Sequence, residues 1–557
     1  MERQSIELPV LAEDAFEPGQ LGEVIEASVE AGIWIKLIHT PENLRVGTPV
    51  IIEGEKNNFY ALVVEIKYPS SPLATAFANS PMTELLSFHD VPGVRGRQFF
   101  ALAHLDCLQV LGWEDDSQRD FDTIPRILSK SRRARQEDLE RVYKEQEFSA
   151  EIGTLSEMED LRVSIDVNEL VQLPFGIFGV TGWGKSVLTK ILATWTIRKQ
   201  LASLLVFDIQ GEYTWRSQEG TTPGLATIFG DRQVVTMALD PDRAPQGAEE
   251  FFLYKENVRA GDLITGLMDQ KLSTPQLNSI YIIDQEVKKR RKLRKEDVNL
   301  LDFIVVMDDS TKPEGVNSLT VPALKNRVYR FARIKFLRKK SSAASLGLTG
   351  KPKPDSIERI LELFRQGKTV VLNFGRYGDN LSLYMFVANL VVRRLRRAYQ
   401  EAAYDKNWNG GAGFHQTVVL LEEAHKFLGP EASRYSIFGK IAREMRKYGL
   451  TLGLVDQRPS QIDPEVYSQL ANRFVFKLTD EKDVKAALTG TINPNMWARL
   501  VRGLDKRTCV VVGSCISVPS VVRTWNYDEK TIKEKLGTSR LVGDVVGAIT
   551  EDDVKDL

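Results

Sequence analysis

The chain has 557 residues, of which 43% are hydrophobic and 27% charged, as in water-soluble globular proteins with two or three domains. A formal net charge of −1 excludes a generally basic nucleic-acid coat but permits local basic surfaces at 130–135, 288–295, 335–340 and 393–397. The sequence has no long apolar run and no signal-peptide pattern, which predicts a cytoplasmic protein without membrane spans. Its three cysteines lack the spacing of metal ligands, so we expect neither disulfides nor a zinc site.

Short β-rich segments separated by glycine, proline and asparagine fill the chain from about residue 21 to about residue 110. This spacing is typical of a small antiparallel barrel. We therefore predict an N-terminal β-barrel domain over residues 1–110. The charge-rich segment after it has helical character, which predicts a helical linker over residues 111–162.

From Val163 onward, apolar runs alternate with helical patterns, which predicts an α/β fold with a mostly parallel sheet. The predicted strands are 175–178, 204–208, 369–374, 417–421, 450–456, 474–478 and 509–512. We assign the first part of this core to residues 163–239 and the second to 366–525. Between them, residues 240–365 have helical patterns and predict an insertion that lies outside the sheet.

The segment Gly179 to Ser186 reads Gly-Val-Thr-Gly-Trp-Gly-Lys-Ser, follows an apolar strand and opens a helical pattern. Its glycines let backbone N–H groups point at phosphate oxygens, where the helix dipole also favours negative charge. We predict that Lys185 reaches the β- and γ-phosphates and that Ser186 ligates Mg²⁺. The predicted nucleotide-binding residues are Gly179, Val180, Thr181, Gly182, Trp183, Gly184, Lys185, Ser186 and Val187.

A second motif, Thr417 to His425, is a short apolar run that ends in two carboxylates. Such a buried strand delivers acidic groups to the edge of a sheet. We predict that Glu422 holds the Mg²⁺ shell and that Glu423 orients and deprotonates the attacking water. The alternative is a solvated acidic turn, which the nearby phosphate loop makes less favoured.

Further polar residues end neighbouring strands. Gln457 follows the strand 450–456 and is a candidate sensor of the γ-phosphate, with a turn-forming amide as the alternative. Arg443 and Arg446 precede that strand, and in a ring of subunits one of them could act as an arginine finger; otherwise both are surface charges. The segment from Asp208 to Glu212 lies at the end of another predicted strand. Its carboxylates could help to hold a metal ion or a water molecule, and a helix cap explains them nearly as well.

Together these motifs resemble the HerA family of ring-forming DNA-translocating ATPases, in the clan that also contains the FtsK translocases. The β-rich N-terminus resembles the barrel that this family shares with rotary ATP synthase subunits. The resemblance is carried by the phosphate loop and by Asp208-Ile-Gln-Gly-Glu-Tyr213, Leu421-Glu-Glu-Ala-His425, Arg443-Glu-Met-Arg-Lys-Tyr-Gly449 and Asp456-Gln-Arg-Pro-Ser460.

The resemblance implies a RecA-like P-loop core in a homohexamer, with ATP and Mg²⁺ between subunits, double-stranded DNA in a central pore and a C-terminal tail, 526–557, packed on a neighbour. It implies work with a NurA-like nuclease in DNA end processing. Glu423 would be the catalytic base, Gln457 the sensor and Arg446 the finger in trans, with Arg443 the second choice; Glu422 stands where the family usually has aspartate. Alternatives are a ring that scaffolds an effector in anti-phage defence and a conjugation or secretion motor.

Overall fold

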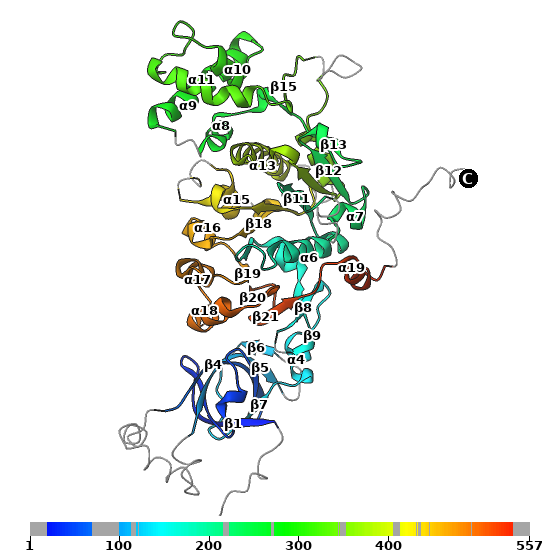
Figure 1. The fold of residues 1–557 in the computed structure, drawn as a ribbon, viewed down its shortest axis with the longest axis vertical. Helices are drawn as coiled ribbons and strands as arrows, with labels where there is room; N and C mark the ends of the chain where they lie inside the picture. The colour runs from blue at the N-terminus through cyan, green and yellow to red at the C-terminus, as the bar shows by residue number, and fades with distance from the viewer. Residues whose placement is uncertain are drawn as a thin grey trace, which may run out of the picture.

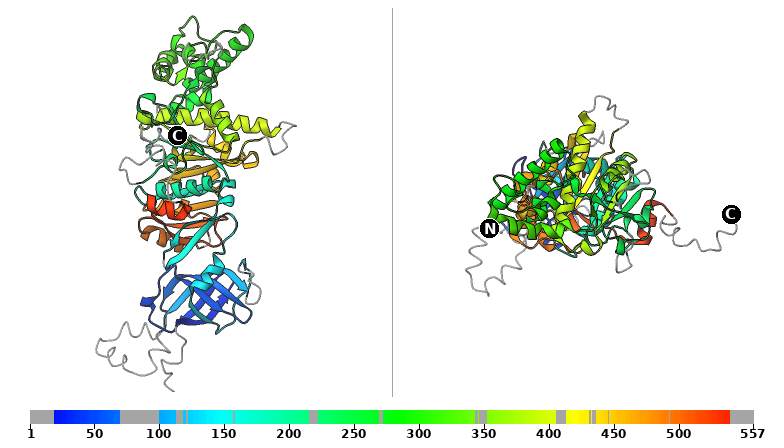
Figure 2. Two further views of the ribbon diagram at one scale, coloured as in Figure 1. Left: turned by 90° about the vertical axis from the view of Figure 1, so that its right-hand side faces the viewer. Right: turned by 90° about the horizontal axis from the view of Figure 1, so that it is seen from above.

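The computed structural model describes residues 19–69, 100–112, 118–120, 122–156, 158–214, 222–268, 272–342, 345, 352–404, 413–430, 432, 436–444, 446–491 and 493–538. Three parts are stacked along the long axis: a barrel at one end, an α/β core in the middle and a helical insertion at the other end (Figure 1). The same stack is seen from the side in Figure 2.

The N-terminal part is a closed barrel in which neighbouring strands are antiparallel, and β2 pairs with β5 to close the circle. Alternate residues of β2, such as Ile33 and Ile35, are fully buried inside, as a barrel strand requires. The predicted barrel is therefore confirmed. Its strands are β1 (Gln20–Ser28), β2 (Gly32–Leu37), β3 (Pro49–Glu53), β4 (Asn57–Lys67), β5 (Leu102–Gly112) and β7 (Lys130–Arg133).

Strand β7 lies beyond the range predicted for the barrel, between β1 and β3. It reads Lys-Ser-Arg-Arg, and Ser131 is its fully buried residue, with a hydroxyl that donates to the Gly22 carbonyl at 2.8 Å. Arg132 binds both oxygens of Asp138, at 2.6 and 3.0 Å. Ion pairs rather than apolar alternation hold this strand, so a hydrophobic pattern does not reveal it.

The segment 111–162 also differs from the helical linker that the sequence predicts. It contains one helix of seven residues, α4 (Gln136–Val142), among its described residues. The rest includes β6 (Gln118–Asp120), β8 (Ser149–Leu155) and the start of β9 (Met158–Asp166). Because β8 pairs with β21 (Ser520–Thr524), this hairpin extends the core sheet instead of merely linking two domains.

The core is a twelve-stranded sheet among the described residues, in the order β13-β12-β16-β11-β17-β18-β10-β19-β20-β21-β8-β9. The strands from β13 to β19 are parallel to their neighbours and the remaining ones antiparallel, which confirms the predicted α/β class. The strands not yet given bounds are β10 (Phe175–Phe178), β11 (Ser203–Asp208), β12 (Val234–Ala238), β13 (Glu249–Glu250), β16 (Thr369–Asn373), β17 (Thr417–Glu422), β18 (Leu450–Asp456), β19 (Asn472–Val475) and β20 (Thr508–Gly513).

Helices cover both faces of this sheet. Along β11, Leu204 and Val206 belong to the apolar cluster that contains α6 (Lys185–Arg198), whereas Leu205 and Phe207 belong to the cluster that contains α13 (Leu381–Tyr404). Alternate residues of a strand face opposite sides, so α6 and α13 lie on opposite faces. The other core helices are α5 (Val167–Gln172), α7 (Leu225–Phe229), α12 (Ser356–Arg365), α14 (His425–Leu428), α15 (Phe438–Glu444), α16 (Pro464–Tyr467), α17 (Glu481–Ala487) and α18 (Pro494–Gly503).

The insertion is built mainly from helices, as predicted, and lies at the far end of the core from the barrel (Figure 1). The predicted range 240–365 is too wide, because it includes β13 of the core sheet and the core helix α12. The longest helix of the insertion, α9, begins after Ser273, whose side chain takes part in a capping box, and ends in a π-helical turn at Arg290–Arg294. The other elements are α8 (Ala260–Gly266), α9 (Thr274–Lys289), α10 (Leu300–Val306), α11 (Val321–Ala332) and the short strands β14 (Leu253–Tyr254) and β15 (Leu337–Arg338).

At the C-terminal end, α19 (Glu529–Leu536) packs on the chain's own core, where Ile532 is fully buried. The preceding Tyr527 shares a hydrogen bond of 2.9 Å with Thr194 of α6. The rest of the predicted tail, 539–557, lies outside the described residues, so its packing on a neighbour stays a prediction. Within the part of the chain that the structure describes, no helix has the length and apolarity needed to cross a bilayer.

Candidate functional site: the carboxyl edge of the parallel strands

The strand order brings the predicted motifs to one edge of the sheet. The phosphate loop follows β10, Glu422 ends β17, and Gln457 follows β18, which lies between those two strands. All three strands are parallel, so their carboxyl ends meet at the same edge.

The phosphate loop is tightly enclosed by β19 and by the turn before β20. Gly184 has a φ of +117°, and a Cβ atom on it would lie 3.0 Å from the Phe476 ring and 3.1 Å from the Arg507 Cα. A Cβ on Gly179 would lie 2.5 Å from the Phe476 Cβ. These two positions therefore require glycine, and the crowding fixes the path of the loop into α6.

Lys185, the first residue of α6, donates hydrogen bonds from Nζ to the carbonyls of Gly179 at 2.8 Å and Val180 at 3.1 Å. Burial lowers the pKa of this ammonium, and the carboxylates of Glu423, Asp456 and Glu422 oppose that shift. The lysine is thus held over the loop by the backbone, with carboxylates nearby. Ser186 and Val187 follow it in the first turn of α6, half-buried.

Glu422 ends β17 in a buried setting. Its Oε1 accepts a hydrogen bond of 2.8 Å from the Tyr213 hydroxyl, and its backbone carbonyl accepts one of 3.0 Å from the Tyr384 hydroxyl. Burial is the main cause that raises the pKa of Glu422 to about 7, and the nearby Asp208 carboxylate adds to it.

Glu423 adopts a left-handed backbone conformation, with a φ of +51°. This conformation costs a non-glycine residue about 1 kcal/mol or more, and such strain clusters at functional sites. It places Glu423 at the turn between β17 and α14, where its side chain is half-buried.

Gln457 joins the phosphate loop to Glu423. Its Oε1 accepts a hydrogen bond of 2.8 Å from the Thr181 hydroxyl, and its Nε2 donates one of 3.0 Å to Glu423 Oε1. Three residues that the sequence predicts for the site therefore contact one another directly. The amide orients the carboxylate relative to the loop, which is the geometry that a water-activating base needs.

Asp456 and His425 lie at the candidate site, and the sequence analysis quoted both in its motifs without giving either a role. His425 Nδ1 lies 2.9 Å from Asp456 Oδ1, and the His425 backbone N–H donates to Asp456 Oδ2 at 2.5 Å. The same imidazole nitrogen lies 3.7 Å from Glu423 Oε2. The signal in the sequence was the aspartate that closes the apolar run of β18, one residue before Gln457.

Asp208 acts as a turn cap in this structure. Its carboxylate accepts hydrogen bonds from the backbone N–H groups of Glu212, at 2.8 Å, and Tyr213, at 3.2 Å. Burial raises its pKa to about 6. Glu212 instead lies 3.8 Å from the Nζ of Lys190, a buried lysine of α6 that the sequence analysis did not single out.

The residues predicted to hold Mg²⁺ offer oxygen donors from Ser186 and Glu422. Among the described residues, no group of three or more His, Cys, Asp and Glu side chains is arranged to hold a metal ion. Mg²⁺ in nucleotide sites is usually held by one or two protein oxygens together with phosphates and water. Ser186 and Glu422 therefore fit a magnesium ion that is bound together with a nucleotide.

The two candidate arginine fingers lie on the segment between α14 and β18. Arg443 of α15 forms an ion pair of 3.0 Å with Glu465 of α16, and the structure shows no ion pair between it and a carboxylate of its own site. Arg446 begins the short 3-10 helix Arg446–Tyr448, and its side chain lies outside the described part of the chain. The structure thus leaves the choice between them open.

Trp183 packs on its own subunit beside the loop. Its indole N–H donates to the Leu504 carbonyl at 3.2 Å, and the ammonium groups of Lys477 and Lys506 lie 5.3 and 5.9 Å from its ring centre. The bulky residue in the loop is thus explained by contacts within the chain.

Comparison with known proteins gives matches over most of the chain. Residues 150–395 match the family model described as "Helicase HerA, central domain". The DNA double-strand break repair helicase HerA of Pyrococcus furiosus is 25% identical over 72% of this chain and 73% of its own length. That of Sulfolobus acidocaldarius is 23% identical over 88% of this chain and 90% of its own length.

Solved structures give weaker matches. The bacterial conjugative coupling protein TrwB in complex with sulphate has a TM-score of 0.47 at 12% identity, over 70% of this chain and 92% of that one. VirB4 of Thermoanaerobacter pseudethanolicus has a TM-score of 0.45 at 15% identity, over 69% of this chain and 97% of that one. Residues 150–395 thus match the HerA central domain, and the chain is similar to HerA helicases over most of its length.

Proposed function

We propose that this protein is an ATPase that forms a ring and moves along double-stranded DNA, in partnership with a nuclease. The observation that carries the ATPase part is the continuous hydrogen-bonded link from Thr181 in the phosphate loop through Gln457 to Glu423. The DNA part is supported by the relatives, which are named as double-strand break repair helicases. Those names do not favour the effector-scaffold alternative.

In this proposal the residues of the sheet edge divide the work of phosphoryl transfer. Lys185 neutralises charge on the β- and γ-phosphates, Glu423 accepts the proton of the attacking water, and Gln457 holds Glu423 in place. Ser186 and Glu422 would hold Mg²⁺, which supplies positive charge to the phosphates when bound. Asp456 orients the His425 ring next to Glu423, at the distances given above.

The proposal includes a homohexamer in which an arginine of one subunit completes the site of the next. Arg443 supports this because its ion pair is with the exposed Glu465 and not with a carboxylate of its own site. Contacts to DNA phosphates would supply affinity without sequence preference, as movement along a duplex requires. A NurA-like nuclease is the partner that we propose.

Steady-state ATP hydrolysis with and without linear duplex DNA tests this function. We expect strong stimulation by DNA in the wild type. The Lys185→Ala variant should lose turnover, because a lost charge at the transferred phosphate costs several kcal/mol of transition-state stabilisation. Lys199→Ala, at the far end of the same helix, is the control and should retain turnover. ATP turnover that does not change when DNA is added would contradict the proposal of a DNA motor. Turnover retained in Lys185→Ala would contradict the assignment of the nucleotide site.

Mixed rings test the action in trans. Wild-type subunits are mixed with Arg446→Ala or with Arg443→Ala subunits at increasing ratios, and total turnover is measured. A finger acting on a neighbour predicts a fall steeper than the fraction of variant subunits for one of the two arginines. A linear fall for both would show that neither acts on another subunit.

A further inference from the structure

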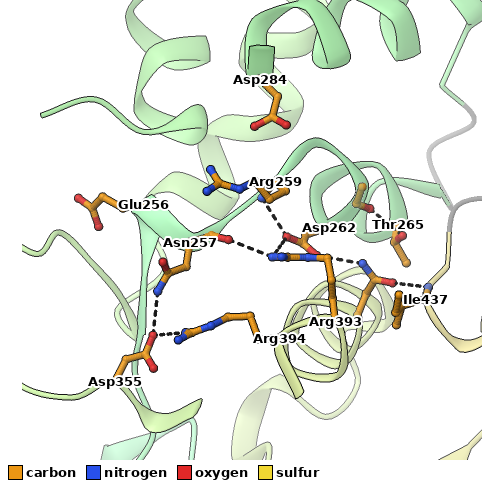
Figure 3. A network of polar contacts seen from close by, with 12 residues as sticks. Glu256, Asn257, Arg259, Asp262, Thr265, Asp284, Asp355, Arg393, Arg394 and Ile437 are labelled. Carbon is orange, nitrogen blue, oxygen red and sulfur yellow. Dashed lines mark hydrogen bonds and ion pairs between the residues drawn. The ribbon is translucent and has the colours of Figure 1, made fainter. Parts of the chain in front are cut away.

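A buried polar network joins the helical insertion to the core (Figure 3). At its centre is Asp262 of α8, a carboxylate with no exposed surface. It accepts hydrogen bonds from Arg393, at 2.9 Å from Nε and 2.6 Å from Nη2, and from the backbone N–H of Arg259 at 2.9 Å. The guanidinium of Arg393 also donates to the Asn257 carbonyl at 3.0 Å. The start of α8 is thus fixed to α13 by a bidentate ion pair.

Asn389, one turn before Arg393 on α13, connects this network to α15. Its Nδ2 donates to Asp262 Oδ1 at 3.0 Å, and its Oδ1 accepts the backbone N–H of Ile437 at 2.9 Å. Ile437 immediately precedes α15, and Asn389 is 2% exposed. A carboxylate only accepts and an N–H only donates, so the two partners allow one orientation of the amide.

The same helix contacts the acidic edge of the candidate site. Tyr384 of α13 donates to the Glu422 carbonyl, and its ring packs edge-on against Phe427 of α14 at 5.0 Å. Tyr384 and Asn389 are five residues apart, which is about 7.5 Å along a helix axis. Helix α13 therefore sets the spacing between the acidic turn and the start of α15.

We propose that Asn389 is a positioning residue that holds the segment beginning with Ile437 and helix α15 at a fixed place relative to Glu422, and so aligns the arginine that acts on the neighbouring subunit. This inference rests on the proposed function, because it requires an arginine finger on that segment. The insertion takes part through Asp262, which holds the amide of Asn389 in its orientation. The insertion is thereby a structural support of the ATPase site.

A double-mutant cycle tests the inference. Asn389→Ala is expected to lower kcat for ATP about tenfold, as the loss of a buried hydrogen-bonded amide at about 1–2 kcal/mol implies, with the KM for ATP within about twofold. Combined with the alanine variant of the arginine that acts in trans, it should cause less than about a twofold further loss, because both changes remove the same interaction. Tyr399→Phe is the control, since Tyr399 lies on α13 and bonds Thr417, away from α15.

The inference would be overturned if the fold-losses in kcat of the two single variants multiplied in the double variant, or if kcat were unchanged in Asn389→Ala. If Asn389→Ala does not fold, Asn389→Ser is used in the same cycle. Hydrogen exchange at the Ile437 amide should accelerate in either variant and not in Tyr399→Phe, and unaltered exchange would also count against the inference. Failure of the proposed function would be seen in different measurements, as the absence of stimulation by DNA or as ATP turnover retained in Lys185→Ala.

Discussion

The bond from Gln457 to Glu423 gives a sharp prediction for Gln457→Ala. A hydrogen bond to a carboxylate is worth about 1.5–3 kcal/mol, and each 1.4 kcal/mol corresponds to tenfold in rate. If the 3.0 Å bond orients the base in the transition state, kcat should fall about 10- to 150-fold. The KM for ATP should stay within about twofold, because Lys185 and the loop N–H groups, which are unaltered, carry nucleotide binding.

The assay is steady-state ATP hydrolysis at saturating duplex DNA, with kcat and KM fitted separately. Gln457→Glu keeps the acceptor for Thr181 but sets a second carboxylate against Glu423, so its kcat should fall at least as far. Gln461→Ala, at an exposed glutamine one turn further on, is the matched control. A raised KM with an unchanged kcat would refute the reasoning, because Gln457 would then bind the nucleotide instead of orienting the base.

Two further predictions concern stability. A Glu422 pKa of about 7 means that the folded state holds this proton more tightly than the unfolded chain, so its contribution to the unfolding free energy falls as pH rises from about 4.5 to about 7. Urea titrations without nucleotide should therefore show that the unfolding free energy of Glu422→Gln rises relative to that of the wild type between pH 5 and pH 8, by an amount on the order of 3 kcal/mol. Arg393→Met should lower the unfolding free energy by about 3–5 kcal/mol, because it leaves the buried carboxylate of Asp262 without its ion-pair partner. The control is Arg397→Met on the same helix, whose arginine side chain is 78% exposed and whose loss should cost about 0.5 kcal/mol. Equal losses in the two variants would contradict a special contribution of the buried ion pair.

The strands that carry the site were predictable because they are buried on both faces and therefore read as apolar runs. β10 and β18 match the predicted ranges 175–178 and 450–456 residue for residue. β12, with the sequence Val-Val-Thr-Met-Ala, has the same buried apolar character, but the sequence analysis did not predict it. The edge hairpin of β8 and β9 alternates charged and apolar residues, and its neighbour β21 comes from the other end of the chain.

The residues of the candidate site could be predicted from the sequence, but the contacts between them could not. Motif spacing predicted Lys185 and Glu423 and made Gln457 a candidate, but the hydrogen bond between the last two depends on the order of the strands in the sheet, which the sequence does not reveal. The pairing of His425 with Asp456 depends on β17 and β18 lying side by side. No sequence pattern pointed to Asn389, because a single asparagine in a long amphipathic helix does not reveal the two partners of its amide.

The position of β10 between β18 and β19 has a consequence for how the protein is made. Phe175 pairs with Gly453 and Asn472, so both neighbours of the strand before the phosphate loop are synthesised about 280 or more residues after it. At about 5–20 residues per second, a ribosome needs on the order of 15–60 s to supply them. During that time the apolar strand lacks both of its neighbours in the sheet, and a nascent chain that ends near residue 395 has the whole segment that matches the HerA central domain without the strands that enclose its phosphate loop. The nucleotide site is thus completed late in the synthesis of each chain. The barrel, whose strands have all been synthesised by residue 133, is the part that can fold first.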